Sequence, residues 1–182
     1  AFTPTLDAGP RSETLESVRR QQWEGELVHE VSRYNPFPVP DNRNVLAQYE
    51  RGRKLALDGS YDALLTVEHD MWLPDHALAS LWETGAPVAY GVYMLRHGVE
   101  VLNAWEYLPG SRNLGESLSI SRRRSRRLPR SGVVQVSGVG FGCTLIRRSV
   151  LETIPFRSGE SGAEAPDVPF ARDCLKADVR QV

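Results

Sequence analysis

Two acidic residues, Glu68 and Asp70, follow directly after an apolar run at residues 63–67, with His69 between them. Apolar runs of this length are typical of strands that are covered on both faces in α/β sheets. Ligands of open α/β sheets bind at the carboxyl ends of the strands. Because side chains alternate along an extended chain, residues 68 and 70 are expected to face one side and His69 the other. Two carboxylates that share a cavity suit Mg²⁺ or Mn²⁺, so the pattern predicts a site for a metal ion and phosphate.

The chain around these acids predicts alternating strands and helices. Apolar patterns bounded by turn residues predict strands at residues 1–5, 26–31, 63–67 and 88–93. Helical spacing and capping signals predict three helices that begin near Ser12, Asp41 and Pro74, the last of them ending at Gly85. This β-α-β-α-β-α-β order favours a mostly parallel central sheet flanked by helices, with right-handed crossovers.

The second half of the chain has a different pattern. Strands are expected at residues 99–105, 133–136 and 143–146, and a short helix at residues 170–177. Between the first two of these strands, residues 109–131 are polar and rich in glycine, serine and arginine, which predicts a mobile loop. The whole chain, residues 1–182, is therefore expected to form one α/β domain.

The composition is that of an ordinary globular protein, with 41% hydrophobic and 25% charged residues. The net charge of −1 provides no reason to expect nucleic acid as a partner. Cys143 and Cys174 alone cannot build a disulfide framework or a zinc site, and a reduced compartment is the default. The sequence has no apolar run of transmembrane length and no signal-peptide pattern, so we expect a cytoplasmic protein.

Arginines crowd into residues 122–130, inside the predicted loop. They have four interpretations: a solvated loop, a lid over a diphosphate, a contact with anionic lipid head groups, and a contact with nucleic acid. Nucleic acid is the least favoured of these, because no aromatic residues that could stack on bases are interleaved with the arginines. Peripheral contact with a membrane stays open.

Five segments, taken in their order and spacing, resemble the GT-A glycosyltransferases, in particular the family 2-like nucleotide-sugar transferases. They are Thr3-Pro4-Thr5 after the first strand, Glu68-His69-Asp70 as the "DxD" segment, Gly91-Val92-Tyr93, the strand GFGCTLIR at residues 140–147, and Asp167-Val168-Pro169-Phe170 as the "ED-x-x-F" motif. The resemblance covers residues 1 to about 177. It implies a GT-A-type (Rossmann-like) single domain with a nucleotide-binding half, residues 1–95, and an acceptor half, residues 96–182.

The resemblance also implies an activity, that of a glycosyltransferase of the hexosyltransferase class. A sugar would pass from a nucleotide-diphosphate donor to a hydroxyl group of a glycan, a lipid-linked acceptor or a small molecule, with inversion of the anomeric centre. Asp70, supported by Glu68, would hold Mn²⁺ or Mg²⁺, which stabilises the charge of the leaving diphosphate. Asp167 would accept the proton of the attacking hydroxyl group. The implied donor contacts are Thr3, Pro4, Thr5, Glu68, His69 and Asp70. Arg43 is added to these contacts from its place at the start of a helix after the second strand, with a surface salt bridge as the alternative.

The sequence departs from the family pattern at three places. The first acid is Glu68 instead of the commoner Asp. Pro166 stands where the last motif usually has an acid, with Glu164 two residues earlier as a substitute. The family often continues with a strand that carries a histidine metal ligand, whereas this sequence ends at Val182. Either a C-terminal segment with that ligand follows, or the third ligand is supplied otherwise.

Two other functions stay open. A nucleotidyltransferase acting on sugar phosphates uses a related sheet, but its glycine-rich, basic loop after the first strand has no counterpart at residues 5–11. A non-catalytic module that binds a nucleotide or a glycan, such as a degenerate transferase, would explain Pro166 and the end at Val182. Asp70 and Asp167 also have a simpler interpretation as caps of the helices that follow them.

Overall fold

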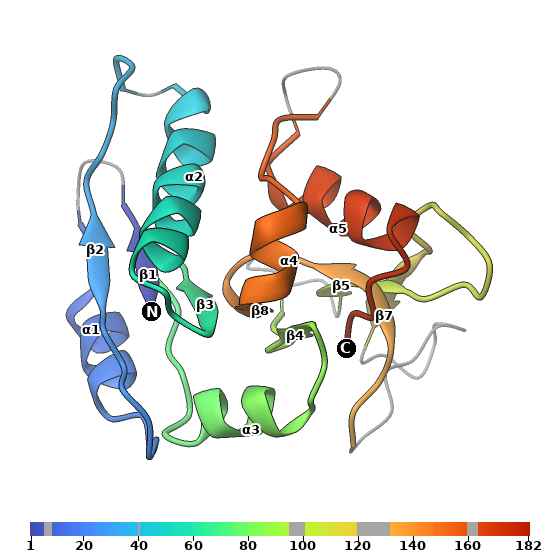
Figure 1. Cartoon of the computed structure of the whole chain (residues 1–182), viewed down its shortest axis with the longest axis horizontal. Coiled ribbons are helices and arrows are strands. Elements are labelled where there is room, and N and C mark those ends of the chain that lie inside the picture. Colours follow the sequence, from blue (N-terminus) through green and yellow to red (C-terminus); the bar gives the residue numbers. More distant parts are fainter. Residues whose placement is uncertain (6–8, 40, 95–100, 120–131, 160–163) are drawn as a thin grey trace.

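Helices and strands alternate along most of the computed structural model (Figure 1), which describes residues 1–5, 9–39, 41–94, 101–119, 132–159 and 164–182. In chain order they are β1 (Phe2–Pro4), α1 (Ser12–Arg19), β2 (Glu30–Ser32), α2 (Arg43–Asp58), β3 (Ala63–Val67), α3 (Ala77–Glu83), β4 (Val88–Tyr90), β5 (Val101–Glu106), β6 (Ser117–Ser119), β7 (Val136–Val139), β8 (Cys143–Arg147), α4 (Arg148–Thr153) and α5 (Asp167–Lys176). Within the described ranges, no helix has both the length and the apolar character that crossing a membrane requires.

The larger sheet has five strands in the order β2-β1-β3-β8-β4, and it is mixed. β1 runs parallel to β2 and to β3, whereas β8 lies between β3 and β4 and is antiparallel to both. The expectation of an α/β fold with a helix-flanked sheet is confirmed. Strands β2, β1, β3 and β4 run in one direction and β8 opposes them, so the sheet is mixed and not purely parallel. The apolar run at residues 143–146 could not reveal its direction, because a strand buried on both faces has the same pattern in either orientation.

A second, antiparallel sheet has the order β6-β5-β7. Its edge strand β6 lies inside residues 109–131, which the sequence predicts to be a loop. The strand was hidden because two of its three residues are polar serines, which break the apolar pattern of a buried strand. The arginines at residues 122–130 lie outside the described residues. Helix α5 begins at Asp167, three residues earlier than expected, because Pro169 is tolerated in a first helical turn, where N–H groups have no partner within the helix.

Successive residues of the central strands divide the apolar core between the two faces of the sheet. Leu65 of β3 and Leu145 of β8 belong to the cluster that includes residues of α1 and α3. Leu64 and Ile146, one position away, belong to the cluster that includes residues of α2 and α4. Neighbouring side chains of a strand point to opposite faces, so helices cover both sides of the sheet. α2 and α4 lie side by side over one of them (Figure 1).

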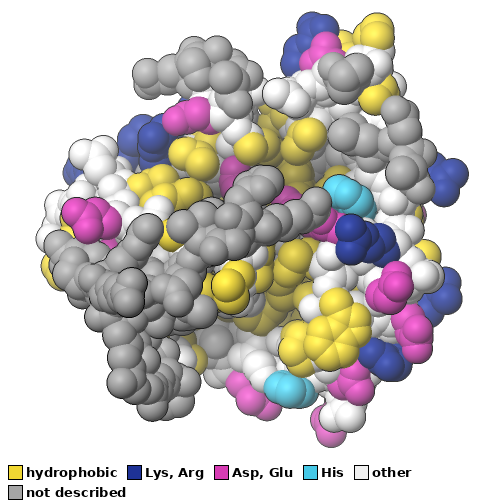
Figure 2. All heavy atoms as spheres, turned by 180° about the vertical axis from the view of Figure 1, so that it is seen from behind, with side chains coloured by type: hydrophobic (Ala, Val, Ile, Leu, Met, Phe, Trp, Pro, Cys, Tyr) yellow, Lys and Arg dark blue, Asp and Glu magenta, His cyan; other side chains and the backbone are white. Residues whose placement is uncertain are grey.

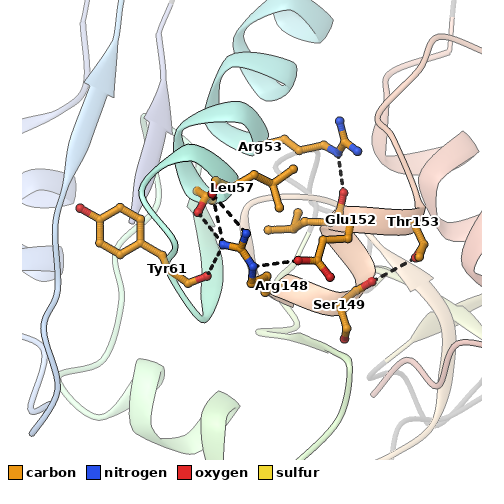
Figure 3. A network of polar contacts seen from close by, with 9 residues as sticks. Arg53, Leu57, Tyr61, Arg148, Ser149, Glu152 and Thr153 are labelled. Carbon is orange, nitrogen blue, oxygen red and sulfur yellow. Dashed lines mark hydrogen bonds and ion pairs between the residues drawn. The ribbon is translucent and has the colours of Figure 1, made fainter.

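Arg148, the first residue of α4, closes the carboxyl end of α2 (Figure 3). Its guanidinium group donates hydrogen bonds to the carbonyl oxygens of Leu57 at 3.2 Å and Tyr61 at 3.5 Å, and it forms an ion pair with Glu152 at 2.8 Å. Carbonyl groups at a helix end have no partner within the helix and carry the negative end of the helix dipole, so a cation is favoured there. The arginine therefore fixes α4 against α2.

Gln181 ties the two sheets and α5 together, and its side chain is only 1% exposed. The side-chain amide accepts a hydrogen bond from the hydroxyl group of Tyr90 in β4 at 2.6 Å. It donates to the carbonyl oxygens of Ser137 in β7 at 3.0 Å and of Ala171 in α5 at 3.1 Å. One buried amide thus provides hydrogen-bond partners for buried groups of three elements.

Replacing Gln181 with Ala should lower the free energy of unfolding by about 2–4 kcal/mol, because buried polar groups lose their partner and a cavity opens. Urea denaturation followed by circular dichroism measures the loss. Gln22→Ala is the matched control, since Gln22 is exposed, and it should change stability by less than about 0.5 kcal/mol. Equal stabilities of the two variants would contradict a joining role for the buried amide.

Candidate functional site

The chain turns directly after β3 instead of continuing as a strand. The N–H group of Met71 donates to the carbonyl oxygen of Glu68 at 3.1 Å, which closes a turn over residues 68–71. His69 is exposed, while Glu68 and Asp70 are half-buried. Both acids are therefore less exposed than the histidine between them, although a turn is responsible and not the alternation of an extended strand.

Helix α1 holds this turn in place. The N–H group of Arg11 donates to the carbonyl oxygen of His69 at 2.8 Å, and the hydroxyl group of Thr14 donates to the same oxygen at 3.0 Å. The next helix, α3, begins only at Ala77. Asp70 is therefore too far along the chain to cap it, and the simple capping interpretation of Asp70 is wrong.

The glycine-rich segment before β8 lies directly beside Glu68. The N–H group of Glu68 donates to the carbonyl oxygen of Gly142 at 3.1 Å. Next to this contact, the hydroxyl group of the buried Thr66 donates to the carbonyl oxygen of Phe141 at 2.8 Å. Buried carbonyl groups need such partners, so the central strands dictate where residues 140–142 lie.

Tyr93 lies against the same glycine-rich segment. Its hydroxyl oxygen accepts hydrogen bonds from the side-chain amide of Asn103 at 2.6 Å and from the N–H group of Gly142 at 3.3 Å. A Cβ atom on Gly142 would lie 2.6 Å from the Tyr93 ring, and one on Gly140 would lie 2.6 Å from the Tyr93 hydroxyl oxygen. Real Cβ atoms do not approach other atoms that closely, so the ring reaches its position because both residues are glycine.

Two carboxylates from distant parts of the sequence act on the same pair of tyrosines. Burial raises the pKa of Tyr49, and the negative charges of Glu68 and Asp167 raise it further. Burial also raises the pKa of Tyr93, to which Glu68 and Asp167 again contribute. A side-chain hydrogen bond joins Tyr49 to Glu68. We define the candidate site as this cluster of two acids and two tyrosines, together with the neighbouring Asp70.

Asp167 is the first residue of α5 and is half-buried. Burial raises the pKa of its carboxyl group; a hydrogen bond from the N–H group of Val168, at 2.9 Å, partly offsets this increase, and the negative charge of Glu164 adds to it. Glu164, the substitute acid of the motif, forms an ion pair with Arg172 at 2.9 Å. A carboxylate with a raised pKa is a stronger base, which suits the abstraction of a proton.

The predicted nucleotide contacts at β1 lie at the same edge of the sheet as Glu68 and Asp70, which follow β3. β1 and β3 are parallel neighbours, and Phe2 pairs with Thr66. Continued by two residues, this register brings Pro4 level with Glu68. Because the carboxyl ends of parallel strands meet at one edge, the segments after β1 and after β3 border the same region.

The side chains of Thr3 and Thr5 are used inside the protein. Both are buried, and their hydroxyl groups bond to the ring of His29 at 2.9 Å and to the carbonyl oxygen of Ser32 at 2.8 Å. The side-chain amide of Gln48 accepts a hydrogen bond from the N–H group of Thr5 at 2.8 Å and donates to its carbonyl oxygen at 2.7 Å. Contact of the two threonines with a nucleotide stays a prediction. Their hydroxyl groups already have hydrogen-bond partners within the protein.

Arg43, the first residue of α2, is exposed. It forms an ion pair with Asp41 at 2.7 Å, and its guanidinium carbon lies 4.1 Å from the centre of the Phe37 ring. These contacts are those of an ordinary surface arginine at the start of a helix. Contact of Arg43 with a nucleotide also stays a prediction.

A third metal ligand does not join the two acids in the part of the chain that the structure describes. Within it, no group of three His, Cys, Asp or Glu side chains could hold a metal ion. The donors present at the turn are the carboxylates of Glu68 and Asp70, and carboxylate oxygens are the ligands that Mg²⁺ and Mn²⁺ prefer. Two carboxylates fit such an ion where water and a phosphate complete its coordination.

Tyr49 and Asn103 are not among the residues that the sequence predicts for the site, and Tyr93 is predicted only as part of a strand motif. Tyr49 belongs to the apolar stripe of α2, so its type and spacing are those of a core residue. The signal that points to Tyr93 is the pair Gly140 and Gly142, since glycines in a strand-like segment often mark the close approach of another group.

Apolar side chains are exposed near the ends of β3 and β4. Trp72 is 59% exposed and Met94 is 50% exposed. Figure 2 shows one face of the molecule, on which hydrophobic side chains gather in the middle with acidic side chains and a histidine beside them. Two surface hollows, of about 420 and 450 Å³, are lined by residues outside the candidate site.

No protein-family model matches the chain, and no curated protein matches it either. Among solved structures it is similar to A197 from STIV, with 17% sequence identity and a TM-score of 0.61. The match covers 99% of this chain and 78% of A197. At this identity the likeness shows that the α/β fold is shared, and the function has to be argued from the residues of the site.

Replacing Gly142 with Ala should lower the free energy of unfolding by about 1–3 kcal/mol, because the added Cβ atom displaces the Tyr93 ring. The loss should be much smaller in a chain that already carries Tyr93→Ala. Urea denaturation of both single variants and of the double variant measures this coupling. Purely additive losses would show that the glycine and the ring do not constrain one another.

Proposed function

We propose that this protein is a metal-dependent glycosyltransferase with a GT-A-type fold. It transfers a sugar from a nucleotide-diphosphate donor to a hydroxyl acceptor with inversion of the anomeric centre. The observation that carries the proposal is that one segment, residues 140–142, contacts both acidic regions. Gly142 bonds to the backbone of Glu68, and the ring of Phe141 lies 5.4 Å from that of Phe170 in the first turn of α5, which Asp167 begins. Such a transfer needs one acidic group to place a cation and a second to accept a proton, and the candidate site offers acids for both tasks.

Asp70 and Glu68 are the proposed ligands of Mn²⁺ or Mg²⁺. Both carboxylates are half-buried and belong to one turn, which is held by backbone hydrogen bonds to Arg11, just before α1, and to Gly142, just before β8. Because Glu68 already bonds to Tyr49, we assign the larger part of the binding to Asp70. Water and donor phosphate would fill the remaining positions. The bound ion would stabilise the negative charge that forms on the leaving diphosphate.

Asp167 is the proposed base. Burial raises the pKa of its carboxyl group, so the carboxylate takes a proton more readily than an exposed aspartate does. The acceptor hydroxyl group loses its proton to Asp167 as its oxygen forms the new bond to the sugar. Attack from the side opposite the leaving diphosphate inverts the anomeric centre.

A non-catalytic protein that binds a nucleotide or a glycan is the second candidate. The observation in its favour is that no three potential metal ligands converge within the described ranges. A donor-hydrolysis assay separates the two functions. Many active transferases slowly hydrolyse their donor when no acceptor is present, and a binding module should leave the donor intact.

Replacing Asp70 with Asn should weaken the Mn²⁺-dependent binding of a nucleoside diphosphate at least about tenfold, because a neutral amide is a poorer ligand for a hard cation. Calorimetric titration of UDP and of GDP, with and without Mn²⁺, measures the effect. Asp62→Asn is the matched control, since Asp62 is exposed and precedes the same strand. Unchanged binding by the Asp70 variant would remove this residue from the metal site.

Replacing Asp167 with Asn should lower the transfer rate by about 10²–10⁴-fold and leave donor binding intact, because an amide cannot accept the proton. Turnover by this variant at the wild-type rate would contradict the assignment of Asp167 as the base.

In the wild type, the transfer rate should fall as the pH is lowered through the pKa of Asp167, since the protonated carboxyl group is no longer a base. The raised pKa places this fall at a higher pH than for an ordinary aspartate. Transfer rates of the wild type measured over a range of pH test this expectation. A fall at the pH of an ordinary aspartate would contradict it.

A further inference from the structure

A basic hollow lies at the carboxyl end of α5, and none of the candidate-site residues lines it. It has a volume of about 420 Å³ and is bordered by the turn after β5, the residue before β7 and the segment that follows α5. The polar side chains in its lining are Tyr107, Ser111, Arg112, Gln135, Lys176, Asp178 and Arg180. Its size is that of sites that bind small organic ligands.

Positive charge dominates the lining of this hollow. Arg112, Lys176 and Arg180 contribute three cations, against the single carboxylate of Asp178. The protein as a whole has a net charge of −1, so this concentration of cations is not a general feature of its surface. Cations gathered around one hollow attract an anion and raise its local concentration.

The cations of the hollow are weakly engaged by the protein itself. Among the described residues, no carboxylate lies within 4.0 Å of the guanidinium group of Arg112 or of Arg180. Lys176 has a partner in Asp173 at 3.7 Å. That carboxylate also accepts two hydrogen bonds from Arg157, at 2.6 and 2.7 Å, so its charge is shared.

Two carbonyl groups in the last turn of α5 already have hydrogen-bond partners within the protein. The N–H group of Val179 donates to the carbonyl oxygen of Cys174 at 2.8 Å, and that of Asp178 donates to the carbonyl oxygen of Leu175 at 3.3 Å. Asp178 has a φ of 55°, the left-handed conformation that closes helices in this way. The carbonyl oxygens of Cys174 and Leu175 are therefore occupied by backbone hydrogen bonds.

We propose that this hollow binds the phosphate group of an anionic ligand. Guanidinium groups bind phosphate through two parallel hydrogen bonds, and an ammonium group adds charge. The hydroxyl group of Tyr107 and the amide of Gln135 supply further donors in the same lining. The ligand is a soluble phosphorylated molecule or the head group of an anionic lipid at a bilayer surface. The site is separate from the proposed donor site.

The test compares wild type with the double variant Arg112→Gln/Arg180→Gln, which keeps side-chain length and removes two charges. Calorimetry with inorganic pyrophosphate, in the presence of a chelator that removes divalent cations, probes a soluble ligand. Sedimentation with phosphatidylcholine vesicles, with and without phosphatidylglycerol, probes a lipid head group. Arg19→Gln/Arg51→Gln is the matched control, because both arginines are exposed and lie on α1 and α2.

We expect wild type and control to bind one of the two probes, and the double variant to bind it at least tenfold more weakly. Pyrophosphate binding alone would identify a soluble phosphorylated ligand, and binding to phosphatidylglycerol vesicles alone would identify a lipid head group. Equal binding by wild type and the double variant would overturn the proposal, as would the absence of binding to both probes. Circular dichroism of each variant confirms that the fold is retained. The result is independent of donor binding at Asp70.

Discussion

Four packed aromatic rings hold the candidate site together, and the positions of its acids depend on them. The ring centre of Phe141 lies 4.9 Å from that of Tyr49, 5.2 Å from that of Phe156 and 5.4 Å from that of Phe170. Tyr49 belongs to α2, Phe170 to α5, Phe156 follows α4, and Phe141 stands between two glycines before β8. Such tilted and edge-to-face contacts add about 0.5–1.5 kcal/mol each beyond burial. Because the rings join segments that are remote in sequence, they bring Asp167 toward the end of β3.

The same packing concentrates negative charge in a partly buried place. Glu68 and Asp167 each raise the pKa of Tyr49 and of Tyr93, so negative charge dominates around the two rings. Burying like charges near one another costs stability, and perturbed groups of this kind cluster at functional sites. The proposed cation would offset that cost when the donor is bound. The glycines at residues 140 and 142 serve the same arrangement, since they let Tyr93 lie against the turn.

Charge of the opposite sign is gathered at the other proposed site. The hollow at the end of α5 is lined by Arg112, Lys176 and Arg180, although the chain as a whole is nearly neutral. Helix α5 connects the two regions, because Asp167 opens the helix and Lys176 ends it. The buried side-chain amide of Gln181 also fixes α5, because it donates a hydrogen bond to the carbonyl oxygen of Ala171 in that helix. A single rigid element thus carries an acid of one site and a cation of the other.

The sequence by itself determined the order of most helices and strands and the place of Glu68 and Asp70 after β3. These features follow from apolar periodicity, prolines and glycines, which act over a few residues. Only the tertiary structure decided that β8 runs antiparallel beside β3, and an apolar run has no direction. That pairing sets Gly142 against Glu68 and so brings Tyr93 to the acids. The place of Tyr49 was also decided by the tertiary structure. Its spacing along the sequence is that of a core residue, and only side-chain packing across the fold places it beside the carboxylates.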